Sequence, residues 1–236
     1  MFAQRNAAAS LLLGVLLIAG CASKTPIDQV DLMPAPDVYG DGMLNPLPVE
    51  SPFDDIPYKG ILYATDRKPA SAEDTEKYYL NDRGQILRVG VARIEAGTKE
   101  FSWERAREIS MLKTRTDKYP IKVADADEWG LIGATVPQFL DLSIESDNPP
   151  PDATQQFVDA INAQLARSKR KHVTIYVHGY KVVYENPVLV ASELWHFLGY
   201  DGAFIAYAWP STPSKFAYIK DSDTSSGFAR NFRILL

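Results

Sequence analysis

The stretch HVTIYVHGYKVVYENP, residues 172–187, decides the fold class. Its first part is an apolar, β-branched run, which is typical of a buried strand. The run ends in His178-Gly179. A helix is predicted to follow, because Asn186 is a good N-cap residue and Pro187 suits the first helical position. A buried strand that passes through a turn into a helix predicts an α/β fold with a parallel sheet.

The segments on either side complete a βαβ unit. Residues 151–168 carry apolar side chains at helical spacing and are expected to form a helix, with Asp152 as its N-cap. Residues 203–210, AFIAYAWP, read as a second buried strand. We therefore expect strands 172–178 and 203–209 to be adjacent and parallel, with helix 187–198 between them and Gly199 ending that helix.

The region before this unit is predicted to be rich in β-structure. Its expected elements are strands at 60–65 and 85–96 with a polar loop between them, a short helix at 102–113, and a strand pair at 119–126 and 129–136. The segment SDNPPP, residues 146–151, marks a boundary because consecutive prolines exclude regular strand pairing.

Length and charge limit the possible functions. The chain has 236 residues, of which 46% are hydrophobic, enough for one sizeable core. Its formal net charge is −5, which argues against a nucleic-acid partner. The short basic cluster Arg167, Lys169, Arg170 and Lys171 is interpreted as a solvated helix end.

The N-terminus has the pattern of an export signal. Residues 1–20 place Arg5 before an apolar stretch that is too short to span a bilayer but suits a signal peptide. Cys21, the only cysteine, follows IAG, and IAGC resembles the bacterial lipobox, in which the cysteine is acylated. This resemblance implies a lipid-anchored protein of the bacterial cell envelope, and Ala22 favours the outer membrane over the inner one. The alternative is an ordinary signal peptide followed by an incidental cysteine.

Residues 21–57 are rich in proline and are interpreted as a tether between membrane and domain. The alternative is a strand-like arm packed on the domain, using Leu44, Leu47 and Val49. The expected organisation is a signal peptide (1–20), a tether (21–57), an N-terminal β-rich part (58–148) and the first half of an α/β core (149–236).

His178-Gly179 stands where a parallel strand gives way to its crossover helix, the edge at which open α/β sheets bind ligands. In α/β-hydrolases, a backbone N–H from such a turn forms half of the oxyanion hole. We expect the N–H of Tyr180 to fill this role, with Gly179 leaving room for the reacting carbonyl. The alternative is a turn with a structural role only.

The motifs YVHGY (176–180), LGYDG (198–202) and AYAWPS (206–211) together resemble a bacterial α/β-hydrolase family long known only as a domain of unknown function. Its members are often envelope proteins grouped with esterases and lipases. Upstream, ILYATDR and RVGVARIEA resemble the N-terminal extension of the same family, so the resemblance runs from about residue 58 to the end. It implies a nucleophilic serine in a G-x-S-x-G-like elbow, followed by an acid and a histidine, with a small-molecule or lipid ester as substrate.

No G-x-S-x-G occurs in this sequence. His172 opens a strand, His178 belongs to the proposed oxyanion turn and His196 lies within the crossover helix, so none is an evident base. We expect the nucleophile, base and acid to lie beyond residue 236, and hence serine hydrolase activity only in a longer form. The alternative is a non-catalytic envelope lipoprotein that uses a degenerate hydrolase scaffold for binding.

Several other residues are weaker candidates. Trp209 either walls an acyl pocket or caps the core, and Asp66 and Arg67 are expected to form an internal ion pair. Asp221, Ser222 and Asp223 are candidates for lining a site entrance, and the alternative is that they cap a helix. Asp125, Asp127 and Glu128 are candidates for a cation site, and the alternative is a solvated turn. No cofactor or metal motif is found.

Overall fold

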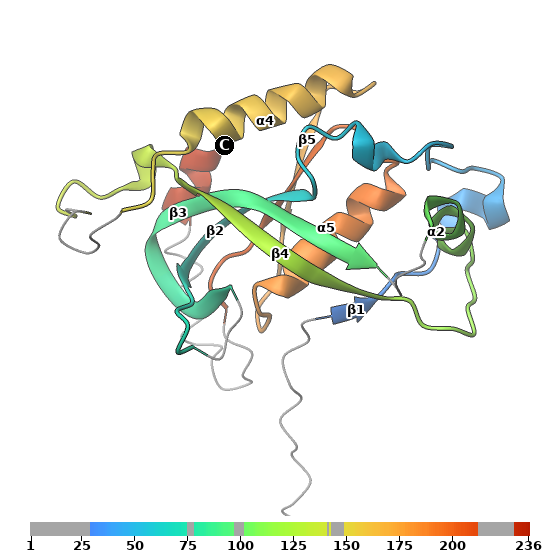
Figure 1. Cartoon of the computed structure of the whole chain (residues 1–236), viewed down its shortest axis with the longest axis horizontal. Coiled ribbons are helices and arrows are strands. Elements are labelled where there is room, and N and C mark those ends of the chain that lie inside the picture. The colour runs from blue at the N-terminus through green and yellow to red at the C-terminus, as the bar shows by residue number, and fades with distance from the viewer. Residues whose placement is uncertain (1–28, 75–77, 97–101, 141, 143–148, 212–228) are drawn as a thin grey trace, which may run out of the picture.

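The computed structural model describes residues 29–74, 78–96, 102–140, 142, 149–211 and 229–236. One mixed six-stranded sheet, in the order β1-β4-β3-β2-β6-β5, forms its centre (Figure 1). In chain order the elements are β1 (Gln29–Asp31), the 3-10 helices η1 (Asp37–Gly42) and η2 (Pro52–Asp54), β2 (Ile61–Pro69), β3 (Tyr79–Ala96), α2 (Trp103–Ser110), β4 (Pro120–Leu131), the 3-10 helix η3 (Gly133–Thr135), α4 (Thr154–Arg167), β5 (Val173–Val177), α5 (Glu185–Phe197) and β6 (Ala203–Tyr207).

The predicted parallel pair is confirmed. Strand β5 pairs with β6 in parallel from Val173 opposite Ala203 to Val177 opposite Tyr207, and α5 connects the two strands. Strand β6 also pairs in parallel with β2, so that a single sheet runs across the expected boundary near residue 149. All five residues of β6 are buried, as its continuous apolar sequence requires in the middle of a sheet.

The upstream strands are longer than predicted. Strand β2 runs to Pro69 and β3 begins at Tyr79, so most of the expected polar loop is a long antiparallel hairpin. The expected strand pair at 119–126 and 129–136 is also wrong, because β4 is a single strand that follows β3 along most of its length. Interruptions in the register let β3 and β4 curl across the molecule in front of α5 (Figure 1).

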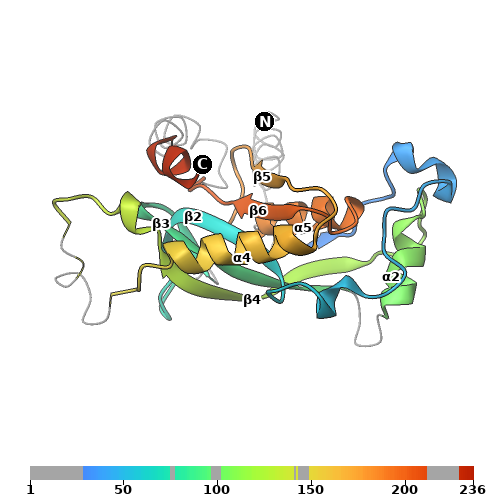
Figure 2. The ribbon, with the colours of Figure 1, turned by 90° about the horizontal axis from the view of Figure 1, so that it is seen from above.

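The helices begin and end close to the predicted residues, with small shifts at their caps. Helix α4 starts at Thr154, and Asp152 lies one residue before the N-cap position, yet its carboxylate still accepts the N–H of Thr154 at 2.9 Å. Helix α5 starts at Glu185, so Asn186 and Pro187 lie inside its first turn. Gly199 has a positive φ of 70° after the end of α5, as expected of a helix terminator. Helix α4 runs along the sheet in Figure 2.

Over residues 29–57 the structure favours the packed arm over the free tether. Strand β1 pairs with β4, and Leu47 is 4% exposed. The N–H of Met33 donates to Glu193 of α5 at 2.5 Å. Leu44 and Val49, the other apolar residues considered for such an arm, are exposed.

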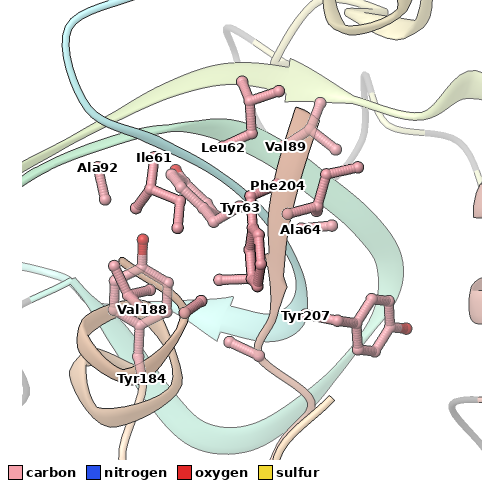
Figure 3. Close-up of a cluster of buried hydrophobic side chains, with 14 of the residues drawn as sticks. Ile61, Leu62, Tyr63, Ala64, Val89, Ala92, Tyr184, Val188, Phe204 and Tyr207 are labelled. Atoms are coloured by element: carbon pink, nitrogen blue, oxygen red, sulfur yellow. The ribbon is translucent and has the colours of Figure 1, made fainter. Parts of the chain in front are cut away.

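The core lies between the sheet and α5, and Figure 3 shows its central side chains. Tyr63, Tyr79 and Tyr184 pack edge-on or tilted against one another, with ring centroids 4.7 to 5.8 Å apart. The hydroxyl groups of Tyr63 and Tyr79 are 2.8 Å apart, and Tyr79 donates to Glu128. Tyr184 immediately precedes α5, so this cluster anchors the start of the helix that follows the His178 turn.

Candidate active site

The carboxyl ends of β5 and β6 bring His178 and Trp209 together. The indole Nε1–H of Trp209 donates to the carbonyl oxygen of His178 at 2.7 Å, and Nε2 of His178 lies 3.0 Å from the carbonyl oxygen of Trp209. Their rings stack almost in parallel, with centroids 5.0 Å apart. Both residues are 5% exposed. Trp209, predicted as either a pocket wall or a core cap, is therefore buried and is bonded to the turn itself.

The imidazole of His178 is suited to holding the turn and not to acting as a base. Burial and then the positive charge of Arg67 lower the pKa of His178 to about 3, so the ring is neutral near pH 7. Its Nδ1 lies 2.5 Å from the carbonyl oxygen of Gly179, and Nε2 faces that of Trp209. Because both ring nitrogens face carbonyl oxygens, neither is placed to accept a proton from a nucleophile.

The turn after His178 has an open surface. A Cβ added to Gly179 would meet no atom within 4 Å, so space for a reacting group exists on that side. Lys181 has a positive φ of 70°, and its N–H donates to the hydroxyl of Ser211. The Lys181 N–H is thus already in use, and the neighbouring residue Tyr180 is 57% exposed.

Arg67 supports the loop that follows this turn. Although fully buried, its guanidinium donates to the carbonyl oxygen of Val182 at 2.9 Å and to Asn81 Oδ1 at 2.7 Å. It therefore joins the β2–β3 hairpin to the segment between β5 and α5. No local sequence pattern predicts this contact, because the partners of this buried arginine lie 14 and 115 residues away along the chain.

The expected Asp66–Arg67 ion pair is not formed. Both carboxylate oxygens of Asp66 are buried without a hydrogen-bond partner, and the guanidinium of Arg67 binds other groups. Burial raises the pKa of Asp66 to about 6, and the charges of Arg83 and Arg67 offset only part of this effect. The reason lies in strand geometry, since consecutive residues of a strand point to opposite faces.

A serine–histidine contact lies at the other end of α5. His196 Nε2 is 2.7 Å from Ser110 Oγ, and its Nδ1 is 2.8 Å from the hydroxyl of Tyr200. Ser110 also donates to the carbonyl oxygen of Ala106 at 2.7 Å and has no exposed surface. Its hydroxyl proton is thus directed to a carbonyl and not to the histidine. The arrangement is a satisfied buried network, not an activated nucleophile.

The remaining candidates fall into three groups. Glu128 pairs with Arg88 at 2.6 Å, and no group of three potential metal ligands occurs among the described residues. Lys171 donates to three carbonyl oxygens at the end of α4, which confirms the helix-end interpretation of the basic cluster. Cys21, Asp221, Ser222 and Asp223 lie outside the described residues.

Comparison with known proteins gives one match, to a family model. No curated protein and no solved structure matches the chain. None of the helices described here is long and apolar enough to cross a membrane. The family model described as "Alpha/beta hydrolase of unknown function (DUF900)" matches residues 153–234, which include α4, the β5–α5–β6 unit and the His178 turn. Over these residues the chain is similar to an alpha/beta-hydrolase family of unknown function.

Proposed function

We propose that this chain supplies the oxyanion turn of a serine hydrolase that cleaves an ester or a related acyl bond. The observation that carries the proposal is the strand-terminal His178-Gly179 turn. It is bonded to Trp209 on the next strand and supported from behind by Arg67. It lies at the carboxyl edge of the parallel strands, where α/β folds place their reacting groups.

In this proposal the substrate carbonyl lies against the open side of Gly179. A serine hydroxyl attacks the carbonyl carbon while a histidine takes its proton, and the oxygen becomes negatively charged in the tetrahedral intermediate. The N–H of Tyr180 donates to that oxygen, and a rigid turn avoids reorganisation as the charge develops. The serine, the histidine base and the acid come from residues other than those of the turn.

The proposed enzyme is anchored to the bacterial envelope by acylation of Cys21, and Ala22 favours the outer membrane over the inner one. The support for this part is the sequence IAGC after a short apolar segment. Cys21→Ser should release protein into the soluble fraction or block its processing. A Cys21→Ser protein that remains in the membrane fraction to the same extent as wild type would contradict the anchor.

The catalytic proposal is tested by comparing this chain with the longest polypeptide encoded in the same reading frame. The longer form should hydrolyse short-chain nitrophenyl esters and react with a fluorophosphonate probe, whereas the 236-residue chain should do neither. If the longer form binds the esters without cleaving them and is not labelled, the alternative holds, namely a hydrolase scaffold used for binding.

A further inference from the structure

Lys181, in the turn after β5, has a backbone conformation that a residue with a Cβ atom does not favour. Its φ of 70° lies in the left-handed region, where the Cβ comes too close to the following carbonyl oxygen. Within the described part of the chain, the other non-glycine residue with a positive φ is Tyr200, which lies in the turn that ends α5. Lys181 ends no helix. Strain of this kind persists only where the surrounding structure holds the residue in place.

Ser211 provides a contact that holds Lys181. The N–H of Lys181 donates to the hydroxyl of Ser211, a residue with no exposed surface. The two residues are 30 apart in the sequence, so the bond joins the segment that follows β6 to the turn that follows β5. Because the bond is made at a φ of 70°, it stabilises that conformation against relaxation to a more favourable one.

The segment that carries Ser211 is itself fixed to the sheet. The N–H of Ala208 donates to the carbonyl oxygen of Ala64 on β2 at 2.9 Å. The carbonyl oxygen of Ala208 accepts the hydroxyl of Thr65 at 2.6 Å. Pro210 is buried and its ring restricts its own φ. The hydroxyl of Ser211 is therefore presented to the turn from a segment with little freedom to move.

The bond to Ser211 lies one peptide unit from the proposed oxyanion donor. The N–H of Tyr180 belongs to the peptide unit that joins it to Gly179, and the next peptide unit contains the N–H of Lys181. Peptide units are planar, so only the φ and ψ of Tyr180 separate the two N–H groups. A change in the direction of the Lys181 N–H therefore changes the freedom of the Tyr180 N–H.

We propose that Ser211 is a positioning residue for the oxyanion turn, whose hydroxyl holds Lys181 in the left-handed region and thereby keeps the Tyr180 N–H in one direction. A donor that is already oriented needs no reorganisation as negative charge develops on the substrate. The catalytic effect rests on the proposed function, because it requires the Tyr180 N–H to bind the oxyanion. The hold of Ser211 on the turn does not, and it can be measured without turnover.

The first measurement is amide hydrogen exchange in the 236-residue chain, resolved by residue with NMR spectroscopy. Ser211→Ala should raise the exchange rate of the Lys181 amide at least about 10-fold and leave the amides within β5 unchanged. The matched control is Ser192→Ala, which removes a hydroxyl that donates to the carbonyl oxygen of Leu189 within α5. It should leave the exchange of Lys181 unchanged.

The second measurement is the hydrolysis of a nitrophenyl ester by the longest polypeptide of this reading frame. Ser211→Ala should lower kcat by about 10- to 100-fold with little change in KM, because a misdirected donor weakens transition-state stabilisation more than substrate binding. Adding Lys181→Gly to Ser211→Ala should raise kcat about 3-fold, since glycine adopts a φ of 70° without strain. Adding Lys181→Ala removes the same side chain but keeps the Cβ, and should recover nothing.

Three results would overturn the proposal. They are an equal exchange rate of Lys181 in wild type and Ser211→Ala, a raised exchange rate with an unchanged kcat, and equal effects of Lys181→Gly and Lys181→Ala on the kcat of Ser211→Ala. An inactive longest polypeptide would instead contradict the proposed function, and the exchange rates would then decide alone whether Ser211 holds the turn. The thermal unfolding curve of each variant shows whether kcat is measured on folded protein.

Discussion

His178 and Trp209 face each other in two places: the indole N–H of Trp209 donates to the carbonyl oxygen of His178 at 2.7 Å, and Nε2 of His178 lies 3.0 Å from the carbonyl oxygen of Trp209, to which it donates in the Nε2–H tautomer. Each ring is thereby attached to the end of the neighbouring strand. The relationship fixes the start of the turn relative to β6, and a fixed turn is what an oxyanion-binding N–H needs.

The strength of this relationship can be measured through Trp209→Phe. The change keeps an aromatic ring but leaves the buried carbonyl of His178 without its donor, which should lower the free energy of unfolding by about 1–3 kcal/mol. In a double-mutant cycle with His178→Ala, the coupling reports the stacking of the two rings, because each hydrogen bond uses a backbone carbonyl that the other substitution keeps. The two changes should be non-additive by at least about 0.5 kcal/mol. Additive effects in urea denaturation would show that the two residues are not coupled.

Arg67→Lys tests the support behind the turn. A lysine ammonium cannot reproduce the fork that binds Val182 and Asn81, so the free energy of unfolding should fall by about 2–4 kcal/mol. Arg93→Lys, an exposed change on β3, is the control and should stay within about 0.5 kcal/mol. Equal effects of the two substitutions would argue against support of the turn by Arg67.

Asp66 predicts a pH dependence of stability with a definite sign. Its pKa is raised by burial to about 6, so its protonated form is favoured in the folded state, and stability is lost as pH rises through that value. The lowered pKa values of His178 and His196 act in the opposite direction, since their contributions are lost as pH falls. The measurement must therefore isolate Asp66.

The isolating measurement is the stability of wild type minus that of Asp66→Asn. This difference should fall by about 2–3 kcal/mol between about pH 4 and pH 7 and be flat above. A difference that is constant with pH would show that the pKa of Asp66 is the same in the folded and the unfolded protein.

Ser110 tests the conclusion that the Ser110–His196 pair is structural and that Ser110 is not a nucleophile. Because its hydroxyl donates to Ala106 and has no exposed surface, a fluorophosphonate probe should not modify it. Ser110→Ala should instead lower stability by about 1–3 kcal/mol, since it leaves a nitrogen of His196 without its partner. Mass-spectrometric detection of a probe adduct on Ser110 in the folded chain would make this buried pair the catalytic one.

The parts of the fold that follow local rules could be predicted. The β5–α5–β6 unit follows from two apolar runs and a helix with clear boundaries, and its parallel pairing was expected from the connection alone. The long β2–β3 hairpin could not be predicted in this way, because β2 carries Arg67, whose burial depends on partners distant in sequence. The packed arm at 29–57 is likewise a tertiary effect.

The same distinction applies to the site. His178, Gly179 and Tyr180 were found from their position at the end of a strand. The contact between His178 and Trp209 depends on the register of two parallel strands. The hydrogen bond from Arg67 to Val182 depends on residues that are far apart in the sequence.

The most direct test of the central claim removes one N–H. Tyr180→Pro and Tyr180→Ala both delete the exposed phenol, but only proline removes the backbone donor. In the longest polypeptide of this reading frame, Tyr180→Ala should leave the kcat for nitrophenyl ester hydrolysis within a few-fold of wild type. Tyr180→Pro should lower kcat by about 10²–10³-fold with little change in KM. An equal kcat for the two variants, with both folded as judged by thermal unfolding, would contradict the assignment of the His178 turn as part of the oxyanion hole.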